Sequence, residues 1–459
     1  MECTFDERKQ QLERECVVKP NLFEACLDRL DDFMFPFVQS LYRQEQCDHA
    51  TKFVSGLCSD LECKNAESIA YHFELDRKAM QNFIGQSKWD DVPLRAELTS
   101  QIAIQLGEAN GIIILDPSAF VKSGKASVGV ARQWCGRLGK VDNCQLGLYL
   151  AYASSKGHAL VDGEIYLPKE WTDDKLRMEK AGIPKDRQKY QTRHVTFLEM
   201  LARHGKDLPH QWLTGDDEMG RPIAFRRTLH SLGEQYMLAV PRNTKINVVE
   251  NDTSETEKVQ PPSASSSIQI SKWVAAQTED KWIKIDVRDT EKGPLIVELI
   301  KCQVETGHRS KAGIAMEMAI AIRYIDRDQS VIKQDYYLSN AGPTTTESEY
   351  ARVAKAEHRI EECFERGKGE AGMADYEVRN WTGWHHHQTM SLIASWFLNV
   401  ETRRAEKKDT GNNIQPSASG NRIDHTCTVR MRFIPRRVTE NYETTYTKST
   451  RKALSLAKT

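Results

Sequence analysis

The sequence predicts a mixed α/β protein in which a sheet with flanking helices is interrupted by a β-rich insertion and preceded by a helical N-terminal domain. Three patterns predict this class. Apolar residues recur at helical spacing up to about residue 105, and short aliphatic runs alternate with amphipathic helices between residues 111 and 245. Two runs that alternate at period two follow a Ser- and Pro-rich segment. At 459 residues, the chain is long enough for several domains with a sizeable core.

The composition excludes a membrane-spanning protein and argues against a nucleic-acid binder held by bulk charge. The longest aliphatic run, Ile112 to Leu115, is far shorter than the roughly 20 residues that cross a bilayer. The 64 Lys and Arg balance 65 Asp and Glu. The first residues, MECTFDERKQQ, show no secretory signal, so we expect a cytoplasmic protein. Its 11 cysteines are scattered, without a Cys-x-x-Cys pair, and should be thiols.

The helical N-terminal domain should span residues 1–105. Leu22, Phe23, Cys26 and Leu30 recur at three- and four-residue spacing, and Pro is scarce. Acidic residues outnumber basic residues over the first fifty positions. Oligomer contacts are therefore as reasonable a role for this domain as DNA contacts.

Residues 106–250 should form the first part of the sheet core. GIIILDPSAF is a short strand that Asp-Pro ends, and CQLGLYLAYASSKGHALVDGEIYL is typical of a hairpin. TRHVTFLEMLARHGKD then has helical spacing, QWLTGDDEMG is a strand stopped by Gly-Asp-Asp, RPIAFRRTLHSLG fits a helix and QYMLAV a strand. This order predicts helices packed on a sheet.

Residues 251–345 should form a linker and a β-rich insertion. NDTSETEKVQPPSASSS, at 251–267, has the composition of a flexible connector, and KWIKIDV and AMEMAIAIRYI alternate as strands do. The helical pattern from residue 347 should return the chain to the sheet, so 346–400 completes the core. Residues 401–459 are a basic C-terminal segment, either a DNA arm or a disordered surface segment.

Two aspartates follow predicted strands and are 100 residues apart. Asp116 follows the aliphatic run, and Asp216 follows the later strand. Functional side chains collect at strand ends in open α/β sheets, so these two carboxylates could converge. Either aspartate alone is more often a turn or cap residue.

Glu361 is the candidate for a third carboxylate, on the helix at 347–368. At 100° per residue, Glu357, Glu365 and Lys368 return to nearly the same face, which would otherwise be a solvated surface. Three facing carboxylates would repel one another unless a cation neutralised them. Oxygen ligands suit Mg²⁺, and a pair of such ions clamps the attacking and leaving oxygens of a phosphoryl transfer at a nucleic-acid backbone.

Five blocks of this sequence resemble those of bacterial insertion-sequence DDE transposases. The branch concerned has an RNase H-like catalytic core that a β-strand insertion interrupts. The blocks occur in the family's order: ILDPSAFVKSGKASVGVARQWCGRLGKVDNCQLG, WLTGDDEMG, YYLSNA, HRIEECFERGKGEAGMADYEVR and NWTGWHHHQTMSLIASWFL.

The resemblance implies that Asp116, Asp216 and Glu361 are the catalytic carboxylates and hold two Mg²⁺ ions, for which Mn²⁺ can substitute. DDEMG takes the place of the family's Asp-x-x-Tyr-Gly block, with Met219 in the aromatic position. Asp217 is the alternative second carboxylate, because adjacent side chains on an extended chain point opposite ways.

The Tyr-Arg-Glu-Lys signature of the family is incomplete in this chain. Lys368 matches its lysine, seven residues after the glutamate, and would orient a DNA phosphate. Glu357 stands where the family has Arg, and Ala354 where it has Tyr. Arg359 or Arg352 could replace the missing arginine.

Further residues could contact DNA. The resemblance implies that an aromatic residue of the insertion holds a flipped base, and Trp273 or Trp282 could do so, although a Trp on an alternating strand is usually core. Basic residues close after Asp116 could grip phosphates or form a solvated loop: Lys122, Lys125, Arg132, Arg137 and Lys140. His385, His386 and His387 point about 100° apart on a helix, so they cannot share one ion, and DNA contact or a core edge is expected.

The expected function is therefore that of a bacterial, nucleoid-associated DNA transposase. By resemblance it binds the inverted-repeat ends of its element, cleaves the DNA and joins the 3′ ends to target DNA, as a homodimer in the synaptic complex and without a membrane partner. Two alternatives remain. One is a metal-dependent nuclease that cuts without joining, and the other is an inactive DNA-binding protein descended from a transposase.

Overall fold

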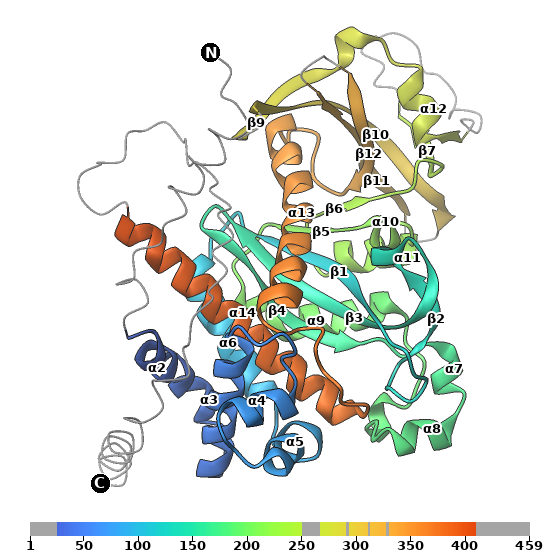
Figure 1. The fold of residues 1–459 in the computed structure, drawn as a ribbon. Coiled ribbons are helices and arrows are strands. Elements are labelled where there is room, and N and C mark those ends of the chain that lie inside the picture. The colour runs from blue at the N-terminus through green and yellow to red at the C-terminus, as the bar shows by residue number, and fades with distance from the viewer. Residues whose placement is uncertain (1–24, 250–266, 291–292, 311–312, 327–329, 410–459) are drawn as a thin grey trace, which may run out of the picture.

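The computed structural model describes residues 25–249, 267–290, 293–310, 313–326 and 330–409 (Figure 1). The predictions for residues 1–24, for nearly all of the connector at 251–267 and for the basic segment from 410 onward lie outside the described residues. Within the described segments, every helix is too short or too polar to cross a bilayer.

The N-terminal region is helical, as predicted. Asn65 and Asp76 cap two of its helices, because their side chains accept hydrogen bonds from Ser68 N and Lys78 N. The layer packs against the C-terminal helix α14 (Trp381–Asp409) (Figure 1). Its helices are α2 (Cys26–Val38), α3 (Gln44–Leu57), α4 (Ala66–His72), α5 (Arg77–Gly85) and α6 (Val92–Leu106).

The core is a mixed sheet with the strand order β4-β3-β1-β5-β6. β1 is antiparallel to β3 and parallel to β5, and β5 is parallel to β6. Most residues of β3 and β4 are buried although they point alternately to two faces, so both faces of the sheet are covered. The strands are β1 (Ile112–Val121), β2 (Ala131–Cys135), β3 (Lys140–Ser154), β4 (Gly157–Ile165), β5 (Trp212–Gly215) and β6 (Tyr236–Ala239).

Helices flank this sheet, so the predicted fold class is confirmed. Those between β4 and β6 are α7 (Lys169–Thr172), α8 (Lys175–Lys180), α9 (Arg193–His204), α10 (Asp217–Gly220) and α11 (Ile223–Ser231). The long helix α13 (Glu347–Glu370) is capped by Thr346, whose side chain accepts a hydrogen bond from Glu349 N. It contacts β1, β4 and β5 and crosses in front of β1 in Figure 1.

The insertion continues the core sheet instead of forming a separate one. β12 pairs with β6 from Tyr337↔Ala239 to Ser339↔Met237, which joins all twelve strands of the described residues. A second apolar cluster, which contains Trp273 and Ile270, fills this region. Its elements are β7 (Lys245–Val248), β8 (Ile268–Gln269), α12 (Ile270–Ala275), β9 (Ile283–Thr290), β10 (Gly293–Ser310), β11 (Gly313–Ile325) and β12 (Val331–Ser339).

The prediction that Asp-Pro ends the first strand was wrong. β1 continues through Asp116 and Pro117 to Val121 and stays paired with β3 over its whole length. What ends at this point is the pairing with β5, whose last partner residue is Gly215 opposite Leu115. Beyond Leu115, no strand of the described residues pairs with β1 on that side, so a residue without an N–H is tolerated there.

Candidate active site

Asp116 and Asp216 lie side by side where β1 and β5 separate. The last paired residues of the two parallel strands are Leu115 and Gly215, so each aspartate is the next residue of its chain. A side chain at Gly215 would come within 2.8 Å of the Leu115 carbonyl oxygen, so glycine allows the strands to approach this closely. Such a split between neighbouring strands is where α/β sheets place their functional groups.

The local structure distinguishes Asp216 from its neighbour Asp217. Asp216 caps α10, and its Oδ1 accepts hydrogen bonds from Glu218 N and Met219 N at 3.1 Å. The Asp217 side chain is 53% exposed and pairs with Arg221 at 3.1 Å. Only Asp216 is therefore held at the split, and Asp217 faces solvent.

Asp116 is a carboxylate without a compensating partner. Its side chain makes no hydrogen bond or ion pair with another described residue. Burial, and then the charges of Asp216 and Glu357, raise its pKa well above the usual value. Burial also raises the pKa of Asp216 to about 6, although the backbone N–H of Met219 favours its charged form. The two groups thus repel one another in the absence of a cation.

Helix α13 brings further charged residues to the same place. Lys368 Nζ donates hydrogen bonds to Ser118 Oγ at 2.8 Å and to Ala119 O at 3.4 Å, which directs this face of the helix toward β1. Glu357 lies about 20° around the helix from Lys368, and Glu361 lies about 40° from Glu357 and about 20° from Lys368. All three side chains therefore lie on one face.

The two glutamates of this face differ in their environments. Glu357 is mostly buried, and burial followed by the charges of Asp216 and Asp335 raises its pKa to about 8. The Glu361 side chain is 67% exposed and pairs with His358 Nδ1 at 2.6 Å. The hydrogen bond from His358 lowers the pKa of Glu361.

Strand β12 supplies a cation next to these acids. Lys333 Nζ pairs with Asp335 Oδ2 at 2.8 Å. Burial alone would lower the pKa of Lys333, but the hydrogen bond and charge of Asp335, followed by the charges of Glu357 and Glu361, raise it. Sequence reasoning missed Lys333, because no local signal links a strand of the insertion to this helix.

Arg352 and Arg359, the candidates to replace the missing arginine of the signature, form ion pairs with other glutamates. Arg352 pairs with Glu349 at 2.7 Å and donates to Asn110 O at 3.0 Å. Arg359 pairs with Glu362 at 2.8 Å, about 200° around the helix from Glu357.

The donors at the split suit a divalent cation of the Mg²⁺ type. They are carboxylate oxygens, and the Asp116 carboxylate has neither a cation nor a hydrogen-bond donor among the described residues. In the conformation described, however, no three His, Cys, Asp or Glu side chains of the described residues converge closely enough to hold one ion. The acids are near enough to raise one another's pKa without forming a closed cage.

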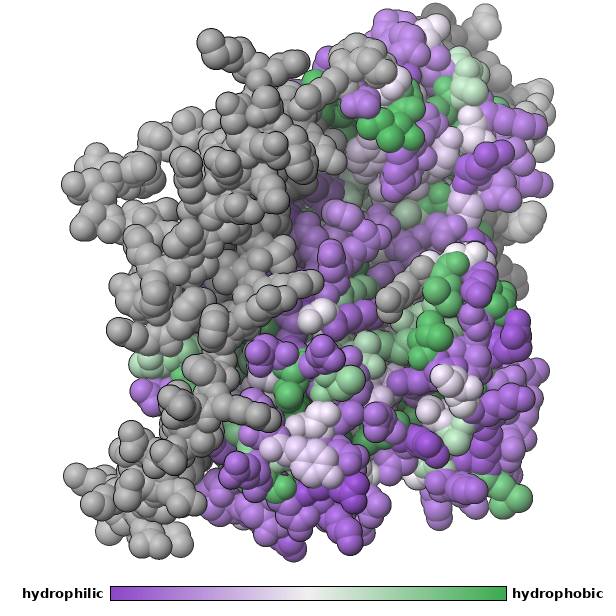
Figure 2. All heavy atoms as spheres, viewed as in Figure 1, coloured by the Kyte–Doolittle hydropathy of each residue, from purple (hydrophilic) through white to green (hydrophobic). Residues whose placement is uncertain are grey.

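The basic residues that follow Asp116, which were predicted to contact DNA, differ in their exposure. Lys122 Nζ lies 3.6 Å from the centroid of the Tyr376 ring, and burial lowers its pKa to about 8. Lys125 and Arg132 are exposed. The part of the surface beside α13 that Figure 2 leaves visible is mostly hydrophilic.

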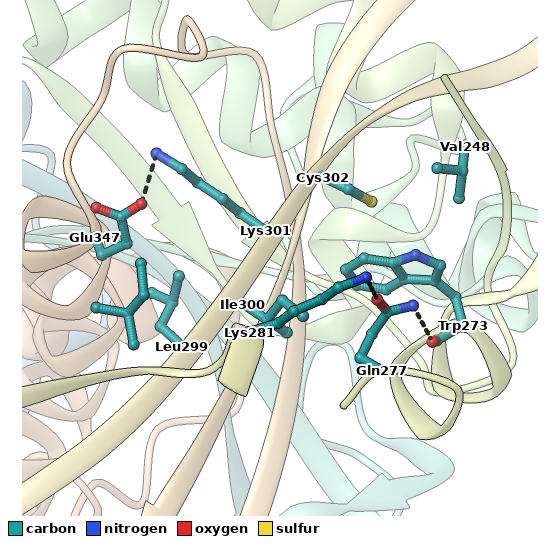
Figure 3. Close-up of a pocket in the computed structure, with 10 residues that line it drawn as sticks. Val248, Trp273, Gln277, Lys281, Leu299, Ile300, Lys301, Cys302 and Glu347 are labelled. Carbon is teal, nitrogen blue, oxygen red and sulfur yellow. Dashed lines mark hydrogen bonds and ion pairs between the residues drawn. The ribbon is translucent and has the colours of Figure 1, made fainter. Parts of the chain in front are cut away.

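The two tryptophans lie in the insertion. Trp273 is 8% exposed and lines a cavity of about 460 Å³ between α12 and β10, together with Lys281 and Cys302 (Figure 3). Trp282 is half-buried beneath Arg323, whose guanidinium carbon lies 4.1 Å from the ring centroid.

The three consecutive histidines are buried in the core. Of the two settings predicted for them, DNA contact and a core edge, the structure therefore favours the core. His386 stacks on Trp89 at 3.6 Å, and its ring nitrogens lie 3.0 Å from Ile84 O and Trp89 O. His387 Nε2 lies 2.9 Å from Gly372 O. Burial lowers the pKa of both to about 4.

His385 belongs to a buried ionic network that sequence reasoning missed. Its Nε2 lies 3.1 Å from Glu164 Oε2. Asp162, which is fully buried on β4, accepts from Arg95 at 2.7 Å and from Arg203 at 2.8 Å and lies 3.0 Å from His204 Nε2. These residues come from α6, β4, α9 and α14, so the network ties helices to the sheet.

Residues 36–294 match the family model described as DDE superfamily endonuclease. The match includes Asp116 and Asp216 and ends before α13. No curated protein matches. Among solved structures, the chain is similar to a piggyBac transposase in a synaptic complex with hairpin DNA, with 10% identity, a TM-score of 0.38, and coverage of 82% of this chain and 69% of that one.

Proposed function

The chain belongs to the DDE superfamily endonuclease family, whose enzymes depend on divalent metal ions, and from this premise we propose that it is a DNA transposase. In this proposal it binds the inverted-repeat ends of an insertion sequence, cleaves the DNA there and joins the liberated 3′ ends to target DNA.

The observation that supports this most is the pair of aspartates at the split between β1 and β5. Asp116 and Asp216 are contributed by neighbouring parallel strands and repel one another without a cation. A third carboxylate would come from α13, where Glu361 holds the position that the family signature gives to glutamate.

The side chains of the site would act in distinct ways. Asp116 and Asp216 would hold the metal ions, and Lys368 would orient a DNA phosphate from its position next to Ser118. Two Mg²⁺ ions, which Mn²⁺ can replace, would when bound favour attack by water or a 3′-hydroxyl and stabilise the departing oxyanion. The hydrophilic surface that is visible beside α13 would admit the DNA (Figure 2).

DNA contacts away from the metals would include phosphate contacts by exposed basic residues and stacking by an aromatic residue. Lys125 and Arg132 are exposed near the strand that carries Asp116, and Lys122 lies beside them. Trp273 and Trp282 remain the candidates for stacking with a flipped base, and Arg359 for a phosphate contact. A homodimer would bring two ends together.

The test is a reconstituted reaction with DNA that carries the inverted repeats flanking the reading frame. We expect Mg²⁺-dependent cleavage at the repeat ends and joining of pre-cleaved 3′ ends to a plasmid target. The Asp116→Asn variant should bind the same DNA and do neither. Cleavage without joining would show a nuclease, and binding without cleavage an inactive relative. Equal activity of parent and variant would refute the site.

A further inference from the structure

The hairpin formed by β2 and the first residues of β3 carries an exposed apolar pair. Trp134 lies directly opposite Val141, and the two residues are 59% and 49% exposed. Leu138, in the turn between the two strands, is 42% exposed. Large apolar side chains that gather on a surface are typical of a site of interaction.

The β2–β3 hairpin projects beyond the strands on either side of β3. β1 ends at Val121, opposite Cys144, and β4 ends at Ile165, opposite Gly147. Among the strands of the described residues, only β2 therefore pairs with β3 between residues 140 and 143. In Figure 1, β2 lies to the right of β1 and β3. A two-stranded ribbon of this kind is narrow enough to enter the major groove of duplex DNA.

The apolar pair lies on the same face of the sheet as Asp116. Side chains alternate between the two faces along a strand, and directly opposed residues share a face. Tyr149 is opposite Asp116, and Val141 precedes Tyr149 by eight residues, which is an even number. Trp134, opposite Val141, and Arg132, two residues before Trp134, therefore share the face of Asp116.

A loop leads across this face from the site to the hairpin. Gln145 of β3 lies on the same face as Asp116 by the same register, and its side chain donates a hydrogen bond to Val128 O at 2.6 Å. Residues 123–126 of the loop are exposed and include Lys125. DNA that extends from the aspartates along this face would pass the loop and then reach the hairpin.

The charge of this region complements DNA. Residues 121–143 contain five Lys or Arg residues and one acidic residue, whereas the whole chain has a net charge of -1. The acidic residue, Asp142, pairs with Lys140 at 3.1 Å. Arg132 is exposed. A basic surface with an exposed aromatic side chain suits a nucleic acid better than it suits a second copy of this nearly neutral chain.

We propose that the β2–β3 hairpin binds the DNA duplex that enters the candidate active site, with Trp134 and Val141 in a groove and Arg132 against a phosphate. The proposal rests on the proposed function, because it takes DNA as the substrate.

The register also locates this contact on the DNA. Eight residues of β3 separate Val141 from Tyr149, which is opposite Asp116. At about 3.4 Å per residue, this is at most about 27 Å. B-DNA rises about 3.4 Å per base pair, so the contact should lie up to about eight base pairs from the cleaved bond.

The experiment uses the full-length protein and a duplex that carries the inverted repeat flanking the reading frame. Fluorescence anisotropy measures the affinity at several salt concentrations, and hydroxyl-radical footprinting locates the protected backbone. The variants are Trp134→Ala and Arg132→Ala. Leu232→Ala is the matched control, because Leu232 is also 59% exposed but precedes β6, at the opposite end of the parallel strands from Asp216.

We expect Trp134→Ala to weaken DNA binding about tenfold without changing its salt dependence, because the variant loses an aromatic contact and no charge. Arg132→Ala should lower the salt slope by about one phosphate contact. In both variants, protection should be lost up to about eight base pairs from the cleaved bond and should persist at the bond itself. Leu232→Ala should bind as the parent does.

The outcomes separate this proposal from the proposed function. If the parent cleaves the duplex and Trp134→Ala shows the affinity and footprint of the parent, the hairpin proposal is wrong and the proposed function stands. If the parent neither prefers nor cleaves the repeat-containing duplex, both fail.

Two further measurements test other roles of the β2–β3 hairpin. Light scattering without DNA measures the oligomeric state, and a parental dimer that Trp134→Ala converts to monomers would show an interface between copies and overturn the proposal. Thermal unfolding of Trp134→Ala should match that of the parent, because the side chain is exposed. A lower melting temperature together with an unchanged salt slope for Arg132→Ala would indicate a structural role and would also overturn it.

Discussion

Replacing Asp162 by Asn should destabilise the protein strongly, because Asp162 is the buried centre of the ionic network between the sheet and its helices. Its side chain is fully buried, and its two oxygens contact Arg95, Arg203 and His204 at 2.7, 2.8 and 3.0 Å. Asn keeps the shape of the side chain but removes the charge and turns an amide N–H₂ toward a cation.

The size of the destabilisation depends on which ionic contacts remain after Asp162 is replaced. Glu164 Oε1 still contacts Arg95 at 3.2 Å and Arg203 at 2.7 Å, so neither guanidinium loses every partner, whereas His204 loses its carboxylate. Breaking a buried ion pair on one side costs about 3–5 kcal/mol, and the remaining partner places this case at the lower end, about 3 kcal/mol. At about 2 °C per kcal/mol, the melting temperature should fall by about 6 °C.

The pH dependence gives an independent check. Burial alone would raise the pKa of Asp162, but Arg95, His204 and Arg203 outweigh it and hold the pKa well below its usual value. A lowered folded-state pKa contributes stability that is present above the unfolded value, about pH 4, and is lost as the pH falls toward the folded value. The difference in melting temperature between the parent and Asp162→Asn should therefore have its full size at pH 7 and become smaller below about pH 4.

The assay is thermal unfolding by circular dichroism at pH 7 and at several values below pH 5. Glu67→Gln is the control, because Glu67 pairs with Arg77 at 3.0 Å on the surface, and its loss should leave the melting temperature unchanged within error. A fall of less than about 2 °C for Asp162→Asn at pH 7 would refute the reasoning.

Three further predictions follow from the site and the core. Mn²⁺ binding should weaken as the pH falls through about 6, since the raised pKa of Asp216 leaves a protonated carboxyl below that value, and calorimetry at pH 5 and pH 8 measures this. Lys368→Met should weaken DNA binding in a filter assay and lower the salt dependence by about one phosphate contact; an unchanged salt slope would argue against a phosphate contact. His386→Ala should cost about 2–4 kcal/mol in urea unfolding, because the ring fills the space beside Trp89 and contacts two buried carbonyls; a cost below about 1 kcal/mol would contradict this.

Local patterns predicted the elements of the fold well. The aliphatic run at residues 112–115, the hairpin and the long helix from residue 347 each carry their own periodicity, so they are visible without knowledge of their neighbours. The end of β1 was predicted wrongly, because Pro117 is a local signal and its tolerance depends on where β5 stops. The continuity of β12 with β6 was also invisible, since strand pairing across such a separation leaves no local trace.

The sequence by itself determined the chemistry available to this protein: two aspartates after strands, a polar helix face with two glutamates and a lysine, and five blocks of a recognisable family. The tertiary structure alone decided which of these groups meet. It placed Asp116 beside Asp216 through the β1–β5 register, turned Asp217 to solvent, partly buried Glu357 and left Glu361 exposed beside His358. The pKa of a carboxylate depends on its burial and on the charges of residues distant in the sequence, and both follow from tertiary packing. Helical periodicity shows which side chains share a face of a helix but not which element packs against that face.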